Sequence, residues 1–107
     1  MALHDLTALE QAAAIRRRDV SSVELTTHYL ERMGRMADVV GAFALVTDDL
    51  ALRQAERADA LVSRVEDPSW LPVLHGVVVP VKDLNRVAGV RTRFGSRAVD
   101  LVPQVDD

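Results

Sequence analysis

The run Val77-Val78-Val79-Pro80-Val81, which leads into Lys82 and Asp83, constrains the fold of this chain more than any other segment. Its apolar residues follow one another rather than alternate, a pattern typical of a strand covered on both faces in a parallel or mixed sheet. A strand in the middle of a sheet also needs a neighbouring strand at each edge. The run therefore predicts a buried strand in an α/β fold, with a lysine at its end.

The lysine at the end of this strand has two interpretations. Lysine is almost never fully buried without a partner, so Lys82 can mark the exit of the strand into solvent and pair with Asp83 or another carboxylate. Alternatively, desolvation lowers the pKa of a lysine and lets it serve as a base. Spacing and composition alone favour the paired lysine.

Three helices are predicted before this strand. Thr7 followed by Glu10 forms a capping box for a helix to about Arg18, and Ser21 followed by Glu24 repeats the signal for a helix to about Met36. A third helix begins at Thr47 or Asp48 and ends at Asp67-Pro68-Ser69. Its apolar stripe has helical spacing and consists of Ala51, Ala55, Ala58, Val62 and Val65.

The strands are too few for a complete sheet. Ala42–Val46 is predicted to be a short buried strand, which together with Val77–Val81 gives two to three short strands beside three helices. Sheets of two or three strands with exposed apolar edges are marginal and pair with other chains. We therefore expect an incomplete mixed sheet whose missing neighbours lie in further polypeptide or in another chain.

Composition argues against several classes of partner and site. A net charge of −3 argues against nucleic acid as a main partner, because phosphate binding relies on clustered Lys and Arg. The chain has no cysteine, and His4, His28 and His75 lack metal-ligand spacing, so no metal site is expected. No apolar run approaches the ~20 residues of a membrane-spanning helix, and the start lacks the pattern of a secretory signal. We expect a soluble, cytoplasmic chain with no membrane partner.

The segment from Leu74 to Ser96 resembles the lysine segment of the amidase signature family. The family pattern is roughly L-x-G-[IV]-P-x-x-[IV]-K-D, followed after several residues by G-x-x-T-x-x-G-S. Ten positions agree in register, namely Leu74, Gly76, Val77, Val81, Lys82, Asp83, Gly89, Thr92, Gly95 and Ser96. The helices before the motif also resemble the family's opening portion, so the likeness covers essentially the whole chain.

This resemblance implies acyl transfer from an amide through a triad of lysine and two serines. In the family a serine attacks the carbonyl and forms an acyl-enzyme, while the lysine acts through a second serine, in a cis peptide linkage, as base and then acid. The resemblance implies that Lys82 is catalytic and that Asp83, Thr92, Gly95 and Ser96 form a supporting loop. It implies no metal and no organic cofactor.

The two serines lie in a glycine- and serine-rich segment that these 107 residues do not contain. The only adjacent serine pair, Ser21-Ser22, has no flanking glycine. We therefore expect residues 1–107 to be the N-terminal part of a single amidase domain that is inactive alone. Residues 1–66 are predicted to be helical with one short strand, and residues 67–107 to hold the catalytic-lysine strand and the following loop.

Two positions depart from the family pattern. Val78 stands where the family usually has proline, and Pro80 comes two residues later, where it removes a backbone donor next to Lys82. Arg93 adds a cation to the loop, which would favour a neutral amine nearby if the two side chains approach. Neither change removes the lysine.

Three hypotheses follow. The chain is the opening portion of an amidase, which acts on a small-molecule amide once the missing segment is present. Alternatively, it is a subunit of a split amidase or amidotransferase, completed by a second chain or by a homodimer partner. In the third hypothesis it is a stand-alone interaction module that has lost catalysis.

Overall fold

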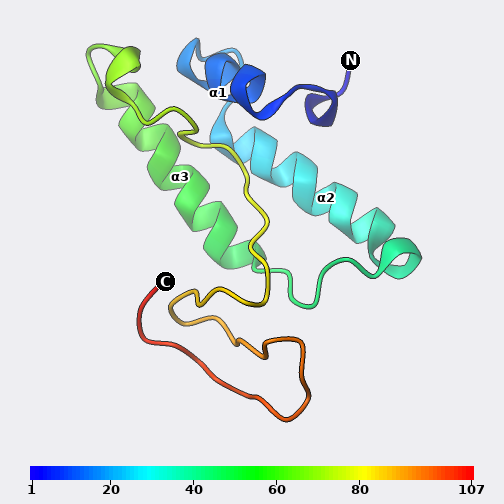
Figure 1. The fold of residues 1–107 in the computed structure, drawn as a ribbon. Coiled ribbons are helices and arrows are strands. Elements are labelled where there is room, and N and C mark those ends of the chain that lie inside the picture. Colours follow the sequence, from blue (N-terminus) through cyan, green and yellow to red (C-terminus); the bar gives the residue numbers. More distant parts are fainter.

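The protein is described by a computed structural model that covers all 107 residues. Three helices, α1 (Ala8–Arg16), α2 (Ser22–Val40) and α3 (Asp48–Arg64), are accompanied by short 3₁₀ turns at Leu3–Asp5 and Pro68–Trp70. Helices α2 and α3 pack against each other near α1. The chain after the second 3₁₀ turn runs between α2 and α3 and then forms a large loop beyond the lower end of α3 (Figure 1).

The starts of α1 and α2 confirm the predicted capping boxes. The Thr7 hydroxyl accepts a hydrogen bond from the Glu10 N–H, and the Glu10 carboxylate accepts one from the Thr7 N–H. Ser21 and Glu24 form the same reciprocal pair. These pairs satisfy backbone donors that the first helical turn leaves free.

The ends of the helices differ from the predicted positions. Helix α1 stops at Arg16, and Arg18 has a positive φ of 63°. Helix α2 continues through the predicted break to Val40 and stops at Gly41, whose φ of 56° is a common helix terminator. The third helix begins at Asp48, one of its two predicted starts.

The core is small and lies where the three helices meet. It consists of Ala14, Ile15, Val20, Leu25, Val62 and Leu71, of which Ile15 and Leu25 are fully enclosed. Of 107 residues only 13 are buried, so most of the apolar surface of the lower half of the molecule remains in contact with solvent.

The predicted α/β fold with a mixed sheet is wrong for this chain, because the structure contains no strand. Ala42–Val46 is an irregular segment in which Phe43, Leu45 and Val46 are all exposed. Val77–Val81, the predicted catalytic-lysine strand, forms no ladder, and Val79 is 63% exposed. The sole β-type pairing is an isolated antiparallel bridge between Thr92 and Leu101.

The physical reason is the absence of pairing partners. A strand is defined by backbone hydrogen bonds to a neighbouring strand, which no part of this chain provides beside Val77–Val81. Pro80 removes one donor in addition. An apolar run therefore predicts a buried strand only when the rest of the sheet is present. No helix combines the length and the apolar character needed to cross a membrane.

Candidate active site around Lys82

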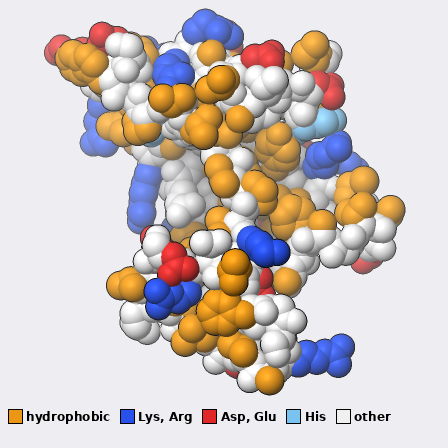
Figure 2. Space-filling view, in the orientation of Figure 1, with side chains coloured by type: hydrophobic (Ala, Val, Ile, Leu, Met, Phe, Trp, Pro, Cys, Tyr) orange, Lys and Arg blue, Asp and Glu red, His pale blue; other side chains and the backbone are white.

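A broad groove separates the helices from the segment that carries the sequence motif. Its volume is about 1370 Å³, and 20 of its 33 lining residues are hydrophobic, so it is predominantly apolar. Helix α2 contributes Tyr29 and Met33, helix α3 contributes Ala51 and Ala55, and the motif segment from residue 76 to residue 95 supplies much of the remaining lining. Figure 2 shows this face hollowed between the helical part and the lower loop.

Gly76 attaches the start of the motif segment to the helices. Its carbonyl accepts a hydrogen bond of 2.7 Å from the Ser22 hydroxyl. Its φ is +81°, and a Cβ placed there would lie 3.1 Å from Cδ1 of Ile15 and 3.2 Å from Cβ of Ser22. Only glycine combines this backbone conformation with such a close approach. The motif glycine therefore fixes where the following residues enter the groove.

The neighbouring histidine adds a second attachment. The Nε2 atom of His75 lies 2.9 Å from the carbonyl oxygen of Ala58 in α3, so that nitrogen carries the proton and donates it. Gly76 is thus bonded to α2 and His75 to α3. Together they hold the motif segment between the two helices.

Lys82 lies at the wall of the groove and is exposed to solvent. It is the only lysine of the chain, and it takes part in none of the four ion pairs in the structure. Its carbonyl accepts a hydrogen bond of 3.0 Å from the Asn85 N–H, which closes a turn. The interpretation in which Lys82 pairs with Asp83 is not what the structure shows.

The Asp83 carboxylate binds the following loop instead. Oδ1 accepts a hydrogen bond of 3.0 Å from the Arg93 N–H, and Oδ2 accepts one of 3.3 Å from the Gly95 N–H. These two hydrogen bonds, from Arg93 first, lower the pKa of Asp83 below its usual range, and the Arg93 charge adds to the effect. Asp83 therefore joins the Lys82 turn to the loop.

Thr92 and Ser96 shape the loop and direct no group toward the lysine. Thr92 is buried, pairs with Leu101 through both backbone groups, and donates its hydroxyl to the Val90 carbonyl at 3.2 Å. The Ser96 hydroxyl accepts from the Ala98 N–H at 3.1 Å. Of the predicted site residues, Lys82, Asp83, Thr92 and Gly95 line the groove, whereas Ser96 does not.

Two carboxylates close the loop at the other end of the segment. The Asp107 carboxylate accepts hydrogen bonds of 2.6 Å from the Arg86 N–H and from Nε of the Arg86 side chain. These interactions lower the pKa of Asp107, with the backbone bond as the largest cause. Asp106 accepts from the Ala88 N–H at 2.7 Å. No sequence pattern signals these contacts, which join residues far apart in the chain.

Asp59 is a further residue that pattern analysis misses. From α3 its two carboxylate oxygens accept from the Ser22 and Val23 N–H groups, at 2.7 and 3.0 Å. An anionic side chain at a helix N-terminus satisfies free donors and complements the helix dipole. Asp59 thus caps α2 from a neighbouring helix and helps hold one side of the groove.

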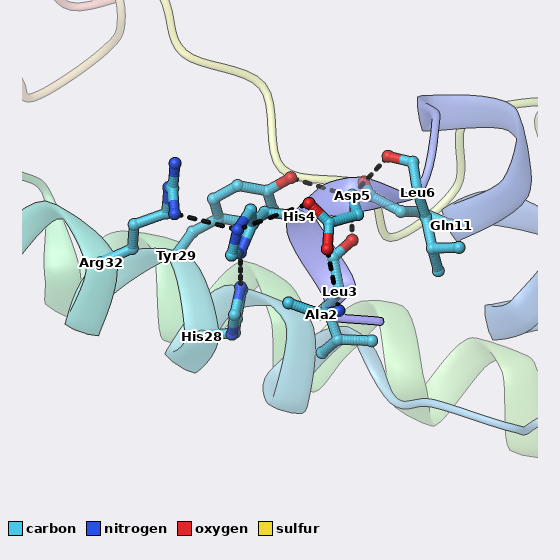
Figure 3. A network of polar contacts seen from close by, with 9 residues as sticks. All are labelled: Ala2, Leu3, His4, Asp5, Leu6, Gln11, His28, Tyr29 and Arg32. Atoms are coloured by element: carbon cyan, nitrogen blue, oxygen red, sulfur yellow. Dashed lines mark hydrogen bonds and ion pairs between the residues drawn. The ribbon is translucent and has the colours of Figure 1, made fainter.

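A separate polar cluster, shown in Figure 3, ties the N-terminal turn to α2. Nδ1 of His4 lies 2.8 Å from Nε2 of His28, and Nε2 of His4 lies 3.0 Å from the Arg32 guanidinium. The Gln11 amide donates to the Leu3 carbonyl and to the Tyr29 hydroxyl. No group of three or more His, Cys, Asp or Glu side chains is placed to hold a metal ion.

Comparison with known proteins identifies one family. The amidase family model matches residues 24–107. The chain is 36% identical over 98 residues to a subunit of the glutamyl-tRNA(Gln) amidotransferase of Nitrosococcus oceani, a match that covers 92% of this chain and 20% of the relative. It is 36% identical over 94 residues to a putative amidase of Synechocystis, covering 88% and 19% of the two chains. The chain spans about a fifth of the length of these curated relatives.

Proposed function

Because this chain belongs to the amidase family, we propose that residues 1–107 are the N-terminal part of a single amidase domain and supply Lys82 as a catalytic residue for cleavage of a carboxylic amide. Residues 1–66 form the helical part of the proposed unit, and residues 67–107 form the lysine segment. The observation that carries the proposal is the position of Lys82. The only lysine of the chain lies unpaired on the wall of its large apolar groove.

The proposed chemistry is serine-based acyl transfer. A serine hydroxyl attacks the amide carbonyl, and the proton of that hydroxyl passes toward the amine of Lys82. Such a role requires a neutral amine, which desolvation favours. Since Lys82 is exposed in the present chain, a further layer of polypeptide over the groove is part of the proposal. Asp83, Thr92, Gly95 and Ser96 shape the loop beside the lysine.

The serines of this chain are poor candidates for the nucleophile. Ser22 lines the groove, but its hydroxyl is buried and donates to the Gly76 carbonyl. The Ser96 hydroxyl accepts from the Ala98 N–H within its own turn. The proposed nucleophile therefore lies in a completing segment, and residues 1–107 are inactive alone.

The identity of the completing segment leaves two versions of the proposal. In the first, the segment belongs to the same polypeptide, and the substrate is a small-molecule amide. In the second, the segment is a separate chain, so that the protein is a subunit of a split amidase or amidotransferase. The names of the relatives favour an assembly, because several are subunits of an amidotransferase.

A chimera tests the proposal directly. The N-terminal fifth of the Nitrosococcus oceani relative is replaced by residues 1–107, and release of ammonia from glutamine and from small aliphatic amides is measured. We expect the chimera to hydrolyse an amide, residues 1–107 alone to show no turnover, and Lys82→Ala in the chimera to abolish activity. An active Lys82→Ala chimera with wild-type rates would refute the role of the lysine.

A further inference from the structure

The turn that receives the Asp83 carboxylate has an unusual backbone. Phe94 has a φ of 51° and Gly95 a φ of 74°, so two consecutive residues adopt the left-handed conformation. This conformation is uncommon for a bulky residue such as phenylalanine. Successive residues in such turns can direct their N–H groups toward one point, which forms a small concave site for an anion.

In this chain the anion in that site is Asp83 itself. Its two oxygens are used separately, since Oδ1 accepts from Arg93 and Oδ2 accepts from Gly95. An asparagine at this position keeps only one of the two acceptors, because its amide group meets the second N–H with another donor. The carboxylate is therefore specifically required by the geometry, beyond its size.

The same residue is covalently next to Lys82. On one side the Lys82 carbonyl is held by the Asn85 N–H at 3.0 Å. On the other side the Asp83 side chain is held by the turn at residues 93–95. Because both oxygens of Asp83 are occupied, the carboxylate leaves the Lys82 ammonium group unpaired. The backbone at Lys82 is thus fixed, and its amine remains free to act.

We propose that Asp83 is the positioning residue of the lysine site: its carboxylate, bound by the Arg93 and Gly95 N–H groups, holds the Lys82 turn against the loop and keeps the amine at the wall of the groove. The catalytic meaning of this arrangement rests on the proposed amidase function. The arrangement itself is independent of it.

The first experiment examines the Asp83 interaction without any assay of activity. The chain holds five glycines, so labelling with ¹⁵N-glycine gives a spectrum in which the Gly95 amide is readily followed. We expect the Gly95 amide shift to follow the titration of one carboxyl group with a midpoint below that of an ordinary aspartate. Asp83→Asn should abolish this pH dependence and move the Gly95 signal at neutral pH.

Asp100→Asn is the matched control for this experiment. Asp100 lies in the same loop and pairs with Arg91 at 3.0 Å, but it accepts no bond from the turn at residues 93–95. The control variant should keep the Gly95 titration, and the Gly76 signal should report an intact attachment to the helices in both variants. A Gly95 titration that persists in Asp83→Asn would overturn the proposed interaction.

The second experiment measures catalysis in the chimera. We expect Asp83→Asn to lower kcat by about 10- to 100-fold, as a misplaced catalytic group does, with KM within about twofold and the thermal midpoint close to that of Asp100→Asn. Asp83→Glu, which retains both acceptors, should restore part of kcat. A wild-type kcat in Asp83→Asn would refute the positioning role. If the wild-type chimera is inactive, the proposed function fails, whereas the glycine spectra still decide whether Asp83 orders the loop.

Discussion

At the scale of single residues, the motif positions divide into those that shape the backbone and one that is free for chemistry. Gly76 is required by a positive φ and by its approach to Ser22. Asp83 has both oxygens engaged, and the Thr92 hydroxyl is used within the loop. Lys82 alone presents an unpaired reactive group to the groove. Its side chain and the backbone of Gly76 therefore give the sharpest tests.

Substitution of Lys82 by arginine separates charge from proton transfer. Arginine keeps the positive charge but cannot release its proton at working pH. In the chimera we expect Lys82→Arg to be as inactive as Lys82→Ala, with an unchanged far-ultraviolet circular dichroism spectrum. Wild-type turnover by the arginine variant would show that Lys82 acts only as a fixed charge.

Substitution of Gly76 by alanine tests the attachment of the motif segment. The added Cβ would lie 3.1–3.3 Å from Ile15 and Ser22 in a left-handed backbone conformation, which should lower the free energy of unfolding by about 1–3 kcal/mol. Gly34→Ala is the matched control, because Gly34 lies within α2 and a Cβ added there would meet no atom within 4 Å. This control should raise stability by up to about 1 kcal/mol. Urea unfolding of dilute samples compares the two, and equal effects would contradict the close approach.

At the scale of elements, helices form where their signals are local, whereas the loop depends on distant partners. The capping boxes of α1 and α2 involve residues three positions apart. The loop from residue 82 to residue 107 is instead held by Asp83 with Arg93 and Gly95, by Thr92 with Leu101, and by Asp107 with Arg86. Carboxylates supply two of these three closures, so the order of the loop should depend on pH.

The pH dependence has a definite sign. The pKa values of Asp83 and Asp107 are lowered in the folded chain by the N–H groups whose hydrogen bonds they accept. A lowered pKa means that the stabilisation is complete above the ordinary aspartate value of about 3.9 and is lost as the pH falls through the folded values. We expect the Arg86 side-chain N–H signal and the Gly95 amide signal to shift toward mobile-loop positions on acidification below about pH 4. Asp107→Asn should produce the Arg86 change at neutral pH while leaving Gly95 in place, and a pH-independent loop would contradict this account.

At the scale of the whole molecule, the main feature is unburied apolar surface around the groove. Phe43, Val79 and Phe94 are between 43% and 63% exposed, and only 13 residues of the chain are buried. Fully burying one such side chain contributes about 1.5–3 kcal/mol. Several of them in contact with water remove much of the margin of about 5–15 kcal/mol that a small domain has.

We therefore expect isolated residues 1–107 to self-associate or to remain partly ordered, and to gain stability when the completing segment is present. Sedimentation velocity and thermal unfolding measure both effects. The two primary amines, at Met1 and Lys82, provide an internal ratio: acylation of Lys82 should slow relative to the exposed N-terminus once the groove is covered. A monodisperse monomer with a sharp, cooperative melt would instead favour a self-sufficient interaction module.

What the sequence by itself determined is local or carried by the family motif. The capping residues Thr7 and Ser21 set the starts of two helices because the bonds involved span a single turn. The motif around Lys82 indicated the family, which the comparisons confirm. The apolar run Val77–Val81 was misread as a strand, because its state depends on neighbours that the run itself cannot supply.

Only the tertiary structure decided which polar groups meet across long separations. Asp59 reaches the start of α2 from 36 and 37 positions away, and Asp107 reaches Arg86 from 21 positions away. A single aspartate in a sequence shows a charge without showing which N–H groups it will face. The same reason explains why Asp83 could be named as a residue of the supporting loop, whereas its bonds to Arg93 and Gly95 required the folded backbone.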